Sequence, residues 1–257
     1  MQNLLISYIP CRTPTLRYWG DSQSPLSIEL KPRSFISIKF YDSVHCVGWN
    51  DEHGEHRCPN SAVNTKQCPT CRSRDILRAY ASADFAGLEH LKERINNVPT
   101  SLYLALFGDV VKCGITATSR VEARLAEQGA DMYAELMRFP TREEARRMEL
   151  LISSEFGITE RVMLNEKIEC ISLSADETKL RDAIAQIRER EPFSSFVMPS
   201  VSIKRIDYNL PEKASLSWKP SGEVLGAKGV FLFIKKDGEN YFVPMHSFKG
   251  HLFDFTP

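Results

Sequence analysis

Residues 102–116 read LYLALFGDVVKCGIT, two apolar runs separated by the dipeptide at 108–109. Apolar runs joined by a short glycine-containing turn are typical of a β-hairpin. A helix is expected next, from about Ser119 to Gln128, and Gly129 is placed to stop it. The centre of the chain is therefore predicted to hold a hairpin followed by a helix.

Two more helices are expected after this segment. Thr141 and Glu144 have the spacing of a capping box, and the apolar stripe that follows them ends at Gly157. Residues 174–191 begin with a similar signal and end at a proline. Before the hairpin, residues 76–97 also carry apolar side chains near helical spacing. Helices therefore dominate the middle of the chain outside the hairpin.

Both ends of the chain have the composition of β structure. Residues 34–41 (SFISIKFY) alternate and contain β-branched and aromatic residues, which favour a strand. Residues 196–257 are rich in Val, Ile and Phe, with turn signals at 220–222 and 237–238. We therefore expect an α+β protein whose C-terminal part is an antiparallel β module. The expected parts are an N-terminal β and zinc-binding module at 1–98, a central domain at 99–192 and the β module at 193–257.

Composition limits the class of protein. The chain has 257 residues, of which 42% are hydrophobic, as in soluble globular proteins. Its 33 Lys and Arg residues balance 33 Asp and Glu residues, so binding to nucleic acid or anionic lipid must come from local patches. No run of about 18 apolar residues occurs, and the N-terminus lacks a basic leader. A cytoplasmic protein without a membrane segment is expected.

Four cysteines crowd one polar segment of the N-terminal part: Cys46, Cys58, Cys68 and Cys71. The CPTC spacing at 68–71 lets two thiolates reach one tetrahedral ion. Because residues 46–75 hold little apolar material, a metal is expected to replace the missing core. The prediction is a structural zinc ion held by four cysteines, with His56 in place of Cys46 or Cys58 as the alternative ligand. A redox switch is the competing interpretation.

The central segment resembles the GIY-YIG nuclease superfamily in the order and spacing of its residues. Tyr103 matches the tyrosine of the first motif strand, and residues 112–114 (KCG) stand where that family has Tyr-Ile-Gly. Arg124 matches the helical arginine, with Arg120 as the competing choice, and Glu149 matches the helical glutamate. Asn165 is placed to match the late asparagine of the family. The resemblance implies a small sheet flanked by helices.

The same resemblance implies phosphodiester chemistry. Tyr103 and Lys112 would lie near a nucleophilic water, Arg124 or Arg120 would contact phosphate, and Glu149 would hold a magnesium ion. Substrate contacts are expected from Cys113, Thr116 and Gln128. The replacement of the second motif tyrosine by lysine is a departure from the family pattern.

The whole chain also resembles an uncharacterised prokaryotic family with a domain of unknown function. In that family a cysteine cluster precedes a Lys-x-Gly-Ile-Thr segment, as CPTC at 68–71 precedes KCGIT at 112–116 here. The stretch GAKGVFL at 226–232 extends the match toward the C-terminus. This resemblance implies an architecture and no particular reaction.

Three functional hypotheses follow. The first is a nucleic-acid-processing or nucleic-acid-binding protein, with magnesium-dependent hydrolysis if Glu149 holds the ion. The second is an enzyme that acts on a small molecule and has reused the central pocket with Cys113, Arg124, Gln128 and Glu149. The third is a non-catalytic interaction module in which zinc and the β parts serve assembly.

Overall fold

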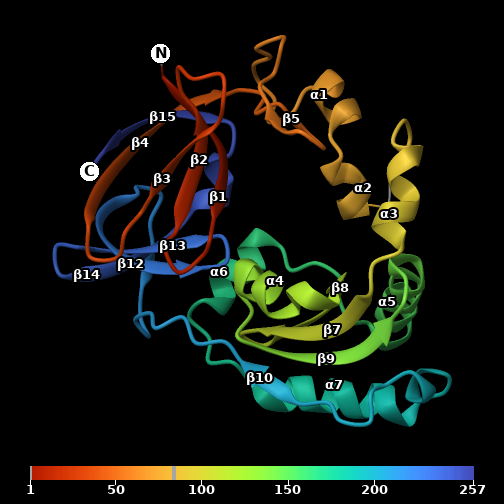
Figure 1. Ribbon diagram of the computed structural model, residues 1–257. Helices are drawn as coiled ribbons and strands as arrows, with labels where there is room; N and C mark the ends of the chain where they lie inside the picture. Colours follow the sequence, from red (N-terminus) through yellow and green to blue (C-terminus); the bar gives the residue numbers. More distant parts are fainter. Residues whose placement is uncertain (1, 83–84) are drawn as a thin grey trace. The chain divides into compact units, whose positions relative to one another are not determined.

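The computed structural model describes residues 2–82 and 85–257, which divide into two compact units (Figure 1). One unit comprises Met1–Lys92 and Tyr208–Pro257, and the other comprises Glu93–Asp207. The expected α+β class is confirmed. The division differs from the three consecutive parts expected at 1–98, 99–192 and 193–257, because the C-terminal strands pair with N-terminal ones.

The first unit contains one large sheet. Its strand order is β11-β14-β13-β12-β4-β15-β1-β2-β3, and the pairs are antiparallel except for β11 and β14. The strands are β1 (Asn3–Ile9), β2 (Thr15–Trp19), β3 (Leu26–Glu29), β4 (Phe35–Val44), β11 (Ser215–Leu216), β12 (Ser221–Lys228), β13 (Phe231–Lys236), β14 (Glu239–Pro244) and β15 (His251–Thr256).

Strand β4 joins the two ends of the chain. Its residue Ile36 pairs with Gly222 of β12, and Ile38 pairs with Phe255 of β15 on the other side. Apolar side chains from both ends fill one core, including Leu5, Leu16, Ile36, Leu232 and Phe253. The alternating pattern of residues 34–41 therefore does form a strand, in the interior of the sheet.

Residues 45–98 carry little regular structure. They contain the short hairpin β5 (Trp49–Asp51) and β6 (Gly54–His56), then α1 (Pro69–Arg74), α2 (Leu77–Ser82) and α3 (Lys92–Asn96). The single helix expected over 76–97 is replaced by α2, a 3₁₀ turn at Glu89–Leu91 and α3. Gly87 has a φ of +73°, which a continuing right-handed helix does not allow. Residues 83 and 84 of the expected helix lie outside the described residues.

The second unit is built on a smaller antiparallel sheet with the order β10-β9-β7-β8. Its strands are β7 (Thr100–Phe107), β8 (Val110–Ala117), β9 (Met132–Phe139) and β10 (Ile203–Arg205), and its helices are α4 (Val121–Gln128), α5 (Arg142–Phe156), α6 (Leu164–Cys170) and α7 (Glu177–Glu189). The predicted hairpin is confirmed, since Phe107 pairs with Val110 across the turn. The Thr141 side chain accepts from the Glu144 N–H at 3.3 Å, as the capping signal predicts.

The two faces of this sheet have separate cores, because alternate side chains of a strand point to opposite faces. Leu102, Leu104 and Leu106 pack with residues of α5 and α7. Tyr103, Ala105 and Phe107 pack with α4 and with Val162 and Cys170 around α6. In Figure 1, α4 and α7 lie on opposite sides of the sheet. Tyr103 therefore lies under α4.

Across the described residues, none of the helices has the length and apolar character that crossing a membrane requires.

Candidate functional site

Tyr103 is the centre of a polar cluster on the α4 face of the smaller sheet. Its hydroxyl accepts from the Lys112 ammonium at 3.3 Å and from the Gln128 side-chain amide at 3.4 Å. Gly114 lies opposite Tyr103 in the sheet, and a Cβ at 114 would come within 2.5 Å of the hydroxyl oxygen. Three predicted site residues, Tyr103, Lys112 and Gln128, are therefore brought together, and Gly114 provides the space.

Positive charge surrounds this hydroxyl. The charge of Arg124 repels the charges of Arg142 and Lys167, and the charge of Lys112 also repels that of Lys167. Burial lowers the pKa of the Arg142 guanidinium; the Glu149 carboxylate works to raise it, and repulsion from Arg146 and Arg124 lowers it further. Several cations are therefore held close to one tyrosine hydroxyl.

The two candidate arginines share Glu127 as a partner but differ in the other charges near them. Arg120 belongs to the 3₁₀ turn before α4 and pairs with Glu127 at 2.7 Å, with 58% of its side chain exposed. Arg124 lies on α4, 3.6 Å from the same carboxylate, and it also acts on Lys167. Arg124 is therefore the one whose charge reaches the cluster at Tyr103.

Glu149 is buried on α5 and is already paired. Its carboxylate accepts from the Arg146 guanidinium at 2.5 Å, and the same nitrogen lies 2.5 Å from a Glu160 oxygen. Burial raises the pKa of Glu149, while Arg146 and, more weakly, Lys112 work to lower it. Lys112 therefore interacts with two groups, through a hydrogen bond to the Tyr103 hydroxyl and a weaker electrostatic attraction to the Glu149 carboxylate.

The other predicted site residues lie elsewhere. Cys113 is fully buried in the core on the opposite face of the sheet, where burial raises the pKa of its thiol. Thr116 is buried on β8 and pairs with Ser101, two positions along the strand from Gly114. Asn165 is exposed on α6. The structure does not bring Cys113 into the Tyr103 cluster, because consecutive residues of β8 point to opposite faces.

The sequence motifs missed Lys167 of α6. Its ammonium donates to the Gln128 backbone oxygen at 2.8 Å and lies 5.0 Å from the centre of the Phe107 ring. Burial lowers its pKa to about 8, and the charges of Lys112 and Arg124 contribute. One signal in the sequence could have indicated it. Lys167 lies two positions after Asn165, the residue placed to match the late asparagine of the GIY-YIG pattern.

The four cysteines form the second cluster, in the other unit. Their sulfur atoms all lie within 4.8 Å of one another, and all four residues are buried. They come from a loop after β4 (Cys46), a loop after β6 (Cys58), the N-terminal end of α1 (Cys68) and its first turn (Cys71). Four thiols at this separation are a group that can hold a metal ion.

Backbone N–H groups point at these sulfurs. The Cys68 N–H donates to the Cys46 sulfur at 3.2 Å. Burial raises the pKa of Cys71, and its neighbouring thiols raise it further. Burial also works to raise the pKa of Cys58, but the backbone N–H groups of Ala62 and Asn60 and the nearby thiols lower it to about 7. Hydrogen bonds to sulfur favour the thiolate form that a metal requires.

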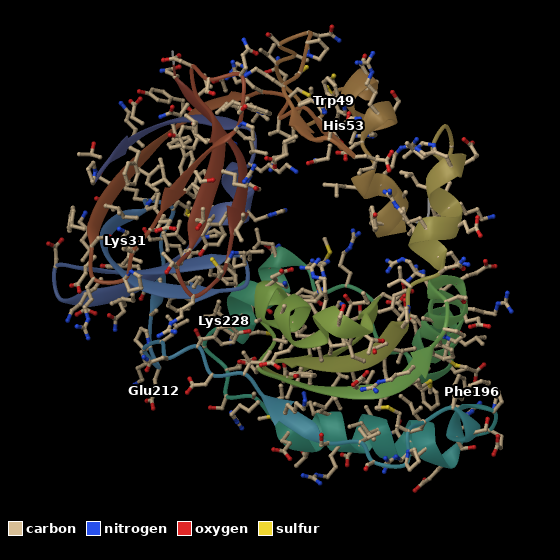
Figure 2. The ribbon with its side chains drawn as sticks, in the orientation of Figure 1. Lys31, Trp49, His53, Phe196, Glu212 and Lys228 are labelled. Atoms are coloured by element: carbon tan, nitrogen blue, oxygen red, sulfur yellow. The ribbon has the colours of Figure 1, made fainter. Side chains whose placement is uncertain are left out.

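Close packing of the backbone supports the cysteine cluster. Gly48 has a φ of +97°, and a Cβ there would come within 1.8 Å of the His56 carbonyl oxygen. The imidazole of His56 lies 2.8 Å from the Asp51 carboxylate and stacks on Trp49. Trp49 and His53 are labelled on this segment in Figure 2. His56 is therefore engaged by Asp51 and is not part of the close group of sulfurs.

A family model spans most of both units, matching residues 34–252. The chain belongs to the DUF2797 family. Members of this family are described as proteins of unknown function. No curated protein and no solved structure matches the chain. The expected membership of a domain-of-unknown-function family is therefore confirmed.

The DUF2797 match runs from the start of β4 into β15. It includes all four clustered cysteines and every residue of the Tyr103 cluster. Both clusters therefore belong to the DUF2797 region of the chain, and each is a candidate for its function.

Proposed function

We propose that this DUF2797 protein binds nucleic acid through phosphate groups at the Tyr103 cluster. The observation that carries the proposal is the Tyr103 hydroxyl in contact with Lys112, with the charges of Arg124 and Arg142 acting around it. Cations and hydroxyl donors are the groups that contact phosphate oxygens in nucleic-acid complexes. Because the net charge of the chain is zero, such a local cluster is needed for binding.

The proposal includes a central domain similar to the GIY-YIG nuclease superfamily. In its favour, the segment order is hairpin β7–β8, helix α4, strand β9 and helix α5, on a small sheet with helices on both faces. Tyr103 and Gly114 are cross-strand neighbours, which accounts for a tyrosine and a glycine at the two motif positions.

Hydrolysis is the second step of the proposal, and Glu149 would hold a magnesium ion for it. A carboxylate oxygen is the ligand type that magnesium prefers, and Glu160 lies on the same side of Arg146. The ion supplies charge neutralisation at phosphate when bound. Arg146 contacts the Oε2 atom of Glu149, so the guanidinium would compete with an ion for that oxygen.

We also propose that the four-cysteine group holds zinc in a structural role. Four thiolates fill a tetrahedral shell and leave no position for substrate. The surrounding residues 46–75 bury few apolar side chains other than the cysteines themselves. An ion at this place would therefore supply the stability that a small apolar core gives elsewhere.

A second candidate function is catalysis on a small molecule. It is favoured by a cavity of about 440 Å³ in the second unit, lined by residues of β9, β10 and the start of α4. Its wall includes Glu135, which is held by Arg138 and by the buried Ser101 hydroxyl. A cavity of this size admits a small polar ligand.

The test is binding and cleavage of single- and double-stranded DNA and RNA, with and without magnesium. The variants are Arg124→Ala and Glu149→Gln, and Arg181→Ala is the matched control because Arg181 is an exposed helical arginine paired with Glu177. We expect Arg124→Ala to weaken binding and Glu149→Gln to abolish any magnesium-dependent cleavage, with Arg181→Ala like wild type. If no oligonucleotide binds at low salt, the nucleic-acid function is rejected and catalysis on a small molecule becomes the favoured function.

A further inference from the structure

Lys167 is a half-buried cation with other cations around it. Its ammonium donates one hydrogen bond, to the Gln128 backbone oxygen at 2.8 Å. Lys112 from β8 and Arg124 from α4 repel it, and the Cys170 thiol on its own helix is the group that attracts it. Among the described residues, no carboxylate forms an ion pair with Lys167. Two of its three N–H groups are therefore available to another acceptor.

The position of Lys167 is fixed by packing. Cys170, one turn further along α6, lies against Gly108, where a Cβ would come within 3.0 Å of the Cys170 side chain. Val162 and Cys170 belong to the same core as Tyr103 and Phe107. The ammonium is therefore held at the C-terminal end of α4 by the fold and does not reach it as a loose surface side chain.

Gln128 connects Lys167 to the Tyr103 hydroxyl. Its side-chain amide donates to the hydroxyl, and its backbone oxygen accepts from Lys167. Gly129 ends α4 with a φ of +84°, so the Gln128 carbonyl is one of the free acceptors at the helix end. The cluster thus has two ammonium groups, Lys112 and Lys167, attached to one hydroxyl and one helix end.

A purely structural role for Lys167 is the competing explanation. A cation at a helix C-terminus does stabilise the helix dipole. That gain is small, however, whereas burial and repulsion hold the pKa of Lys167 at about 8, down from 10.5. The lower pKa means that Lys167 binds its proton more weakly than a free lysine, by roughly a hundredfold or more. A helix end alone does not account for the hydrogen bonds that join Lys167, through Gln128, to the Tyr103 hydroxyl and Lys112.

We propose that Lys167 and Lys112 together bind a multiply charged phosphate group beside the Tyr103 hydroxyl. The inference deepens the proposed function and rests on it for the biological source of the phosphate. A dianion would place its charge beside Lys167, which forms no ion pair with a carboxylate among the described residues, and beside the Lys112 ammonium at the Tyr103 hydroxyl. Phosphate oxygens would accept from the remaining N–H groups of both ammonium ions.

The probe is inorganic pyrophosphate, and the readout is the titration of lysine side-chain carbons by NMR in the full chain. Loss of one signal in Lys167→Arg assigns the Lys167 resonance. We expect pyrophosphate to raise the pKa of Lys167 by about one, a tenfold change in proton affinity. Lys179, which pairs with Asp109 on the surface, is the control lysine and should titrate unchanged. An unchanged Lys167 titration overturns the inference.

Variants separate anion binding from a structural role. Lys167→Met should weaken pyrophosphate binding at least about tenfold, and Lys167→Arg should retain it, because both side chains fill space and only arginine keeps the charge. Equal pyrophosphate affinity in wild type and Lys167→Met would mean a structural role. The wild-type titration decides the question if Lys167→Met fails to fold.

Oligonucleotide binding, measured in parallel, distinguishes the two proposals. A Lys167 titration that responds to pyrophosphate without any oligonucleotide binding keeps the phosphate site and rejects the nucleic-acid function. Oligonucleotide binding with an unresponsive Lys167 keeps that function and rejects the role of Lys167.

Discussion

The cysteine cluster is buried and the Tyr103 cluster surrounds a buried tyrosine, but different interactions hold them. The four cysteines lie in a segment of short elements, β5, β6 and α1, whose compact part consists of the cysteines with Trp49 and Ala62 beside them. The Tyr103 cluster lies on a sheet with apolar cores on both faces. The compact part of the first site therefore consists mainly of the cysteines themselves, whereas the second lies on a sheet with its own apolar cores.

This difference predicts how each site responds to substitution. A site that replaces a core loses its structure with its ligands. A site on a packed sheet can contain unfavourable contacts, such as the repulsion between Lys112 and Lys167. The stability of the rest of the fold offsets their cost. The three tryptophans, Trp19, Trp49 and Trp218, all belong to the first unit, so tryptophan fluorescence follows that unit alone.

Substitution of the clustered cysteines, the proposed zinc ligands, should have the largest effect. Cys68→Ser with Cys71→Ser should abolish binding of one zinc ion per chain, because a structural zinc site contributes of order 10 kcal/mol. Native mass spectrometry measures the metal, and hydrogen exchange should report loss of protection over residues 46–75 with residues 100–156 unchanged. Cys11→Ser is the control, since Cys11 is exposed and outside the cluster. Full zinc content in the double variant would contradict this half of the comparison.

Gly114→Ala should disrupt the Tyr103 cluster by steric contact. The new Cβ would lie 2.5 Å from the Tyr103 hydroxyl and 2.8 Å from the Lys112 nitrogen, and the Tyr103 ring is itself buried in an apolar core. We expect a loss of about 3 kcal/mol in the unfolding of the second unit. Far-ultraviolet circular dichroism in denaturant measures it.

Gly157→Ala is the matched control for Gly114→Ala. Gly157 has a φ of +64°, but a Cβ added there would meet no atom within 4 Å, so this variant should lose about 1 kcal/mol from backbone strain alone. Equal stabilities of the two variants would mean that the Tyr103 cluster is looser than its contacts indicate.

Lys167→Met should stabilise the protein at pH 7. The lowering of the Lys167 pKa from 10.5 to about 8 corresponds to about 3 kcal/mol of unfavourable charge burial, and the lost hydrogen bond offsets about 1 kcal/mol. Because the folded state releases this proton more readily, wild-type stability rises between about pH 8 and pH 10.5, so the advantage of the variant fades there. Chemical denaturation at several pH values tests this, and a destabilised variant at pH 7 would contradict it.

Arg120→Ala should have the smallest effect. Its ion pair with Glu127 is exposed, and exposed pairs contribute less than about 1 kcal/mol. Neither stability nor oligonucleotide affinity should change measurably, in contrast to Arg124→Ala. A larger loss of affinity in Arg120→Ala would assign the phosphate contact to Arg120.

Local signals in the sequence were sufficient for much of the second unit. The hairpin around Gly108, the stop of α4 at Gly129 and the cap at Thr141 all depend on residues within one turn of each other. The cysteine spacing was likewise sufficient to group Cys46, Cys58, Cys68 and Cys71. Short-range rules therefore identified these features.

Long-range contacts were not accessible in the same way. The pairing of β4 with β12 and β15 joins residues about two hundred positions apart, and no local pattern indicates it. Cys113 lies on the opposite face of the sheet from Tyr103, because alternate residues of a strand point to opposite faces. The order of the motif residues alone does not show this. Lys167 reaches Gln128 across 39 positions, so its role depends on the packing of α6.

The most direct test of the account is the salt dependence of single-stranded oligonucleotide binding, followed by fluorescence anisotropy between about 50 and 200 mM salt. If phosphate binds at the Tyr103 cluster, wild type should lose affinity steeply with salt. Arg124→Ala should bind more weakly, with a log–log slope smaller by about one. Binding that is absent at low salt, or identical slopes for wild type and Arg124→Ala, would contradict phosphate recognition at this site.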